Sequence, residues 1–152
     1  MPSASFERSI QVGAPAEVCW PVLTDVDRIA GWVSLISGVV ELEHLSSYEA
    51  VLADRFGMFN LKADLSVKVV ELEEGHRIRF HAEGRDRHVN THINVEAELR
   101  LDPTDDGTLI HVSGEYKVLG TVATMGASTI QKKAEMILEE FFGAAERSLA
   151  TL

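Results

Sequence analysis

The spacing of the apolar residues changes along the chain and predicts the order of its elements. Apolar residues spaced by twos and fours over residues 5–12 indicate a first strand. Pro15 follows, and it suits the first turn of a helix because its missing N–H would have no partner there. We therefore expect two short helices after the first strand, over residues 15–23 and 24–32.

From residue 38 to residue 118 the pattern is that of six consecutive strands. The alternation is clearest between Val89 and Asp102, where every second side chain is apolar. Such a period means that one face of a sheet packs on a core while the other meets water. Short turn sequences separate the strands, so we expect antiparallel pairing. The expected spans are residues 39–45, 48–59, 61–72, 77–84 and 89–102, and a last strand that follows the turn at 102–107 and ends at 118.

After Gly120 the apolar spacing becomes helical, with one apolar stripe over residues 121–150. At 1.5 Å per residue this helix would be about 45 Å long, more than a small flat sheet can bury. A curved sheet that grips the helix along its length would bury it. We therefore predict an α+β helix-grip fold, in which a curved seven-stranded antiparallel sheet wraps around a long C-terminal helix. The two short helices follow the first strand, and residues 1–152 form one domain.

The composition narrows the class of protein and its partners. The chain has 152 residues, of which 45% are hydrophobic, and a formal charge of −10. So acidic a chain repels phosphate backbones and anionic lipids, which argues against nucleic-acid binding and leaves membrane association to a partner or a ligand. No run reaches the ~20 apolar residues of a membrane span, and the start lacks a secretory signal. The single Cys19 cannot form an internal disulfide, so we expect a cytoplasmic protein.

Two segments near the end of the chain carry a family resemblance. Residues 107–110 are GTLI, and residues 118–126 are VLGTVATMG. This strand and the glycine-containing entry into the last helix resemble the CoxG family of carbon monoxide dehydrogenase proteins, whose last helix ends near paired phenylalanines. Phe141 and Phe142 stand at that place here. The opening run over residues 10–20, IQVGAPAEVCW, resembles the first strand and helix of the wider START-like (SRPBCC) superfamily.

The resemblance implies a function and a partner. It implies binding or carrying of a small hydrophobic molecule, quinone-like or lipid-like, by an accessory protein of a carbon monoxide dehydrogenase-type molybdenum hydroxylase. The redox cofactors would belong to that partner, so we expect no cofactor in this chain and favour a carrier over an enzyme. The chain departs from the family in the loop over residues 33–38, VSLISG, which keeps the family's glycine but lacks its cysteine and proline.

The ligand cavity of such a fold would lie between the sheet and the long helix, lined by inward-facing apolar residues. For each of these residues, ordinary core packing is the alternative role. A buried Tyr116 would need a hydrogen-bond partner, either a ligand carbonyl or a backbone carbonyl. The candidate ligand-binding residues are Trp32, Leu35 and Ile36 over the opening, Phe56, Phe59, Phe80, Gly114 and Tyr116 on strands, and Met125, Ile130, Ile137 and Phe141 on the helix.

The sequence offers little for catalysis or metal binding. It contains neither a Gly-x-Ser-x-Gly nucleophile motif nor a phosphate-binding loop. His81 and His92 could face each other across a hairpin, but two histidines are too few for a zinc site, so no metal is expected. Asp54 lies on a mostly apolar strand, where burial would raise its pKa unless a bulge turned it to solvent.

Two other functions stay open at this point. A cyclase or hydrolase acting on an aromatic or polyketide-like substrate would use the same cavity, and Asp54 or Tyr116 would then converge with a histidine inside it. A protein interaction module would instead have a filled interior. The sequence does not indicate the oligomeric state.

Overall fold

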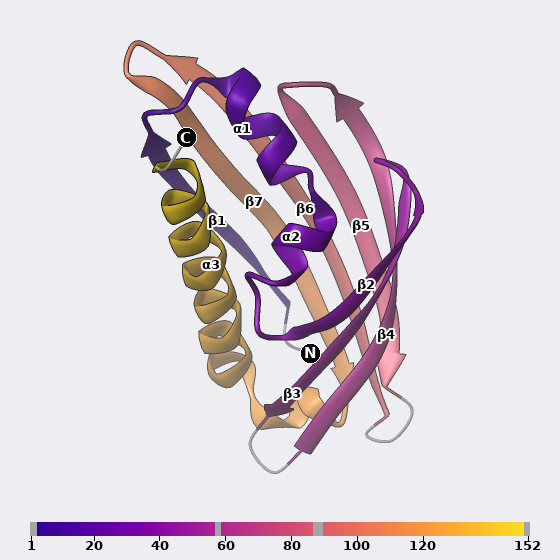
Figure 1. The fold of residues 1–152 in the computed structure, drawn as a ribbon. Helices are drawn as coiled ribbons and strands as arrows, with labels where there is room; N and C mark the ends of the chain where they lie inside the picture. Colours follow the sequence, from indigo (N-terminus) through magenta and orange to yellow (C-terminus); the bar gives the residue numbers. More distant parts are fainter. Residues whose placement is uncertain (1–2, 57–58, 87–89, 151–152) are drawn as a thin grey trace.

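The chain folds as one curved antiparallel sheet that wraps around a long C-terminal helix (Figure 1). The structure, a computed structural model, describes residues 3–56, 59–86 and 90–150. The strands are β1 (Ser3–Val12), β2 (Ile36–Glu43), β3 (Ser47–Phe56), β4 (Phe59–Glu73), β5 (Arg77–Asp86), β6 (Thr91–Thr104) and β7 (Gly107–Gly120). The helices are α1 (Ala16–Leu23), α2 (Val26–Ala30), the 3-10 turn η1 (Val122–Met125) and α3 (Ala127–Ala150).

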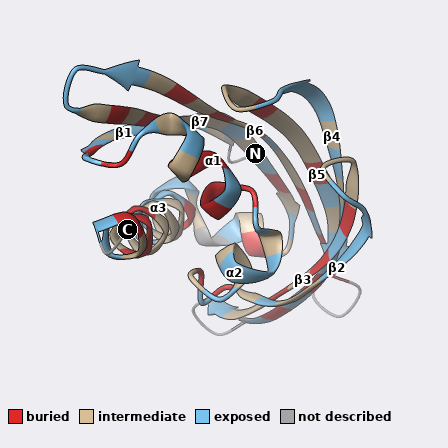
Figure 2. Cartoon of the chain, turned by 45° about the horizontal axis from the view of Figure 1, so that its top comes forward, coloured by how far each residue is buried: buried red, intermediate tan, exposed pale blue. Residues whose placement is uncertain are grey.

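The strand order places the first and last strands next to each other. The order is β1-β7-β6-β5-β4-β3-β2, and every neighbouring pair is antiparallel. Figure 2 shows the sheet curving around α3, with α1 and α2 across its inner side. The predicted fold, a curved seven-stranded sheet with two short helices after the first strand and a long last helix, is therefore confirmed.

The last helix begins later than the sequence pattern predicts. Residues 121–126 form η1 and a turn, and α3 starts only at Ala127. The cause is Gly126, whose φ of 94° lies in the left-handed region and interrupts a right-handed helix. The prediction of one helix from residue 121 was thus wrong by six residues at its start. Among the described residues, no helix combines the length and the apolar content that crossing a bilayer requires.

The buried core is divided into two clusters. The first joins α1 and the C-terminal half of α3 to one end of the sheet and includes Leu101 and Phe142. The second lies over β3 to β7 toward the other end and includes Ala63 and Ile130. Trp32, in the connection from α2 to β2, and Phe141 on α3 pack against both clusters. These two aromatic residues therefore connect the halves of the core.

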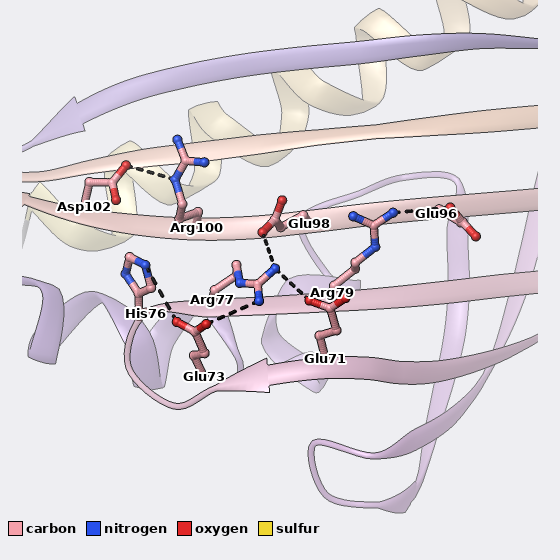
Figure 3. Close-up of polar contacts among 9 residues, drawn as sticks. All are labelled: Glu71, Glu73, His76, Arg77, Arg79, Glu96, Glu98, Arg100 and Asp102. Carbon is pink, nitrogen blue, oxygen red and sulfur yellow. Dashed lines mark hydrogen bonds and ion pairs between the residues drawn. The ribbon is translucent and has the colours of Figure 1, made fainter.

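The outer face of the sheet is covered by cross-strand ion pairs (Figure 3). Arg77 on β5 contacts Glu71 at 2.8 Å, Glu98 at 3.1 Å and Glu73 at 3.3 Å. The hydrogen bond from Arg77 to Glu98, with the charges of the other two carboxylates, raises the pKa of this guanidinium further above its ordinary value. The outer face is therefore a solvated polar surface, and the apolar residues of the strands point to the other side.

Candidate functional site

Two neighbouring cross-strand rows form the centre of the inner face of the sheet. They run across β4, β5, β6 and β7, one side chain from each strand in each row. We call them the inner band, and its residues are Val67, Ala82, Val95 and Tyr116 in one row and Val69, Phe80, Ala97 and Gly114 in the next.

The large side chains of the inner band are half-buried although they lie at the centre of the sheet. Val95 on β6 is half-buried, whereas Ile93 and Leu99 on the same strand and the same face are buried. Phe80 on β5 is likewise half-buried, next to buried Ile78. In a filled core the centre of a sheet is close-packed and exposure increases toward the rims. The order is reversed here, so solvent-accessible surface remains over the inner band (Figure 2).

Gly114 belongs to the inner band because two strands approach each other closely at this point. A Cβ atom on Gly114 would lie 2.2 Å from the carbonyl oxygen of Glu96 and 2.7 Å from the ring of Phe6. The sequence interpretation took Gly114 as part of the cavity wall and overlooked Phe6, which lies over this glycine. Phe6 also stacks on Tyr116, with ring centroids 6.5 Å apart. Its alternation with Ile10 in β1 was the signal that could have placed it on the inner face.

Tyr116 contributes a polar group to an otherwise apolar surface. Its hydroxyl makes no hydrogen bond to any residue that the structure describes. Partial burial, and then the negative charge of Glu135 on α3, raise the pKa of this phenol above its ordinary value. Tyr116 is therefore a neutral donor at physiological pH, and its hydroxyl is available to a bound molecule.

The residues predicted to cover the inner band come from α3 and from the connection between α2 and β2. Ile137 and Phe141 on α3 are half-buried, as are Trp32 and Ile36 on the connection. Ile130 and Leu35 are buried members of the second cluster, so both pack as core. Three further candidates, Phe56, Phe59 and Met125, have side chains outside the described part of the structure.

Asp54 lies on the inner face of β3 and is bound by a lysine from α3. The Lys133 ammonium donates to its carboxylate at 2.7 Å, and the Arg55 N–H donates to it as well. Partial burial raises the pKa of Asp54, but these hydrogen bonds and the charge of Lys133 outweigh burial and hold the pKa below its ordinary value. The expected rise was therefore wrong, because the sequence does not reveal that Lys133 is the partner.

The histidines do not form a metal or catalytic site among the residues that the structure describes. His81 lies opposite Glu96 and pairs with Asn94, whereas His92 lies opposite Arg85, so the two histidines do not face each other. In the described segments no three His, Cys, Asp or Glu side chains gather closely enough to hold a metal ion.

Two open depressions lie away from the inner band. One, of about 340 Å³, is on the outer face, where Glu96, Glu98 and Glu115 are among its lining residues. The other, of about 550 Å³, lies where the start of α1 meets the β6–β7 turn, and Asp105 and Asp106 contribute to its lining. Carboxylates line both depressions, so neither suits an apolar molecule.

Comparison with known proteins gives a family and a fold. The sequence model of the carbon monoxide dehydrogenase CoxG family matches residues 9–150. No curated protein matches the chain. A conserved protein from Geobacillus kaustophilus superposes with a TM-score of 0.80 at 18% identity, covering 97% of this chain and 96% of that one. A START superfamily protein from Mycobacterium smegmatis superposes with a TM-score of 0.71 at 16% identity, covering 97% of each chain.

Proposed function

The chain belongs to the CoxG family of carbon monoxide dehydrogenase proteins, and from this premise we propose that it binds and carries a small hydrophobic molecule over the inner band. The observation that carries the proposal is the reversed order of burial, with half-buried Val95 and Phe80 at the centre of the sheet and buried residues on either side. A bound apolar molecule would cover this surface and gain dispersion contacts with it.

The side chains of the inner band favour one class of ligand. Val67, Val95 and Phe80 are apolar, and the Tyr116 hydroxyl is a hydrogen-bond donor without a partner among the described residues. An apolar body with one hydrogen-bond acceptor would match this surface, because the acceptor would satisfy the phenol. A quinone-like or lipid-like molecule has these features.

We further propose that the carrier serves a molybdenum hydroxylase of the carbon monoxide dehydrogenase type. The support is the name of the family, whose match extends over residues 9–150. On this proposal the redox cofactors belong to the partner, and this chain supplies or receives a hydrophobic molecule. The strongly acidic chain makes direct docking on anionic lipid unfavourable, so contact with a membrane would pass through the partner or the ligand.

The alternative of a cyclase or hydrolase has no specific support in the described residues. That alternative called for Asp54 or Tyr116 to converge with a histidine over the inner face. Asp54 instead binds Lys133, and His81 and His92 are on the outer face of the sheet. We therefore carry the binding function forward.

Two matched valine substitutions test the proposal with the fluorescent apolar dye N-phenyl-1-naphthylamine. Val95→Phe adds bulk over the inner band, whereas Val70→Phe adds the same bulk at a side chain that is 56% exposed. We expect the wild type and Val70→Phe to bind the dye, and Val95→Phe to bind it at least about tenfold more weakly while remaining folded. If the centre were filled core, Val95→Phe would instead lose about 1–3 kcal/mol of stability through overpacking. Absence of dye binding by the wild type would refute the carrier function.

A further inference from the structure

Helix α3 is held to the rest of the fold by different contacts along its length. In its C-terminal half, Phe142, Ala144, Ala145 and Leu149 are buried. In its N-terminal half, Ile130 is the one buried residue of a segment that the structure describes in full. The C-terminal half is therefore anchored by apolar packing, and the N-terminal half depends more on polar contacts.

Two polar contacts join this half of α3 to the neighbouring rim of the fold. Lys133 binds Asp54 at the end of β3, at 2.7 Å. Glu140 accepts from the Ser34 hydroxyl at 3.0 Å and from the Ser34 N–H at 3.3 Å. We call these four residues the polar seam. Figure 1 shows α3 facing the end of β3 and the α2–β2 connection along this side.

The rim of the polar seam is itself one connected piece. The Ala53 N–H donates to the carbonyl of Leu35 at 2.9 Å, so the residue beside Asp54 is bonded to the residue beside Ser34. The two contacts therefore join one rim to one helix. Opening between them would part α3 from this rim without disrupting the sheet.

An apolar gap separates the two contacts of the polar seam. Lys133 and Glu140 are seven residues apart, which is about 10 Å along a helix and wider than an aromatic ring. Ile137 lies between them on the same helix face, is half-buried, and packs against the second cluster. A hydrophobic molecule passing here would contact Ile137 and reach the inner band directly.

The opposite side of α3 is a costlier place to open. There Arg8 on β1 lies over the ring of Phe142, 5.6 Å from its centroid, and Phe142 is only 1% exposed. Parting α3 from β1 would expose this ring to water. At the polar seam, by contrast, the side chains of Lys133 and Asp54 are 26% and 31% exposed, so water can replace each partner as the contact breaks.

We propose that the polar seam is the portal through which the hydrophobic ligand enters and leaves, with the Asp54–Lys133 and Ser34–Glu140 contacts as its two closures. The proposal rests on the carrier function proposed above. It predicts that the rates of ligand loading and release depend on these contacts, while the equilibrium affinity depends on the inner band.

A charge exchange at one closure tests the portal through the release rate of N-phenyl-1-naphthylamine. Asp54→Lys and Lys133→Asp each remove the attraction, and we expect either variant to release the dye about two to five times faster. The double exchange restores the pair and should return the rate to within about twofold of wild type. The control Lys132→Asp changes an exposed neighbouring lysine and should leave the rate unchanged. If the double exchange does not restore the rate, this pair is not a closure.

Covalent closure gives the complementary test. In Asp54→Cys/Lys133→Cys, a short bismaleimide would join the rim to α3, and buried Cys19 would stay out of its reach. We expect dye loading to slow at least tenfold when the bridge is present. Unchanged loading in the bridged protein would overturn the portal and leave the carrier function standing. If the unbridged wild type bound no dye, both proposals would fall together.

Discussion

The rings of Trp32 and Phe141 meet edge to face, with their centroids 5.7 Å apart, and both rings contact both hydrophobic clusters. Trp32 comes from the short connection after α2, and Phe141 comes from the middle of α3. This pair therefore fixes the position of the long helix relative to the residues that cover the opening of the sheet.

Removing either ring should weaken both halves of the core. We expect Trp32→Ala and Phe141→Ala each to cost about 1–3 kcal/mol, less than a fully buried aromatic residue, because both rings are half-buried. A double-mutant cycle by urea denaturation should give a coupling of about 0.5–1.5 kcal/mol. Strictly additive losses would show that the two rings do not support each other.

Gly114 should tolerate no side chain, whereas Gly38 should tolerate one. At Gly114 a Cβ atom would meet the Glu96 carbonyl oxygen at 2.2 Å, but at Gly38 it would meet no atom within 4 Å. We expect Gly114→Ala to cost about 1–3 kcal/mol. Gly38→Ala should be neutral or stabilising by up to about 1 kcal/mol. Urea denaturation of both variants is the measurement, and equal stabilities would contradict the close approach of β6 and β7.

The stabilising contribution of Asp54 should disappear in acid. Its pKa in the folded protein lies below the ordinary value of 3.8, so the charged form is favoured by folding. The stabilisation is therefore complete above the ordinary pKa and is lost as the pH falls through the lowered one. We expect Asp54→Asn to cost about 0.2–1 kcal/mol from pH 7 to about pH 5, and this difference from wild type to shrink below about pH 4.

The control for this pH dependence is Asp64→Asn, which changes an exposed aspartate on the outer face of β4. Its stability should follow that of wild type throughout. A difference between Asp54→Asn and wild type that grew toward low pH would show that the pKa of Asp54 is raised, and would contradict the Lys133 contact.

Cys19 should resist thiol reagents until the protein opens. Its side chain is fully buried, and burial raises the pKa of the thiol, an effect that a hydrogen bond with Thr108 only partly offsets. Because the thiolate is the reactive form, Ellman's reagent should label the native protein at least about 100-fold more slowly than the protein in concentrated urea. Rapid labelling of the native protein would mean that α1 separates readily from the first cluster.

The sequence predicted the features of this fold that depend on neighbours along the chain. The alternation in β6 showed which side chains share a face, because successive side chains of a strand must point to opposite sides. The start of α3 was missed because the helical spacing continues through Gly126, and only the backbone shows its positive φ. Periodicity reports apolar spacing and is insensitive to a single residue in an unusual conformation.

The features of the candidate site were harder to predict, because they depend on contacts between distant residues. Asp54 and Lys133 are 79 residues apart, and nothing local in either segment identifies the other. The difference between Val95, which is half-buried, and Ile93, which is buried, is also invisible in the sequence, since both are β-branched apolar residues on the same face. Whether such a residue is core or ligand surface depends on what lies over it in three dimensions.

The most direct test of the carrier function is native mass spectrometry of the protein purified from its own host. The account predicts that wild type and Val70→Phe carry a hydrophobic adduct, and that Val95→Phe, with its inner band filled, has the mass of the polypeptide alone. An adduct retained equally by Val95→Phe, or its absence from all three proteins, would contradict ligand binding over the inner band.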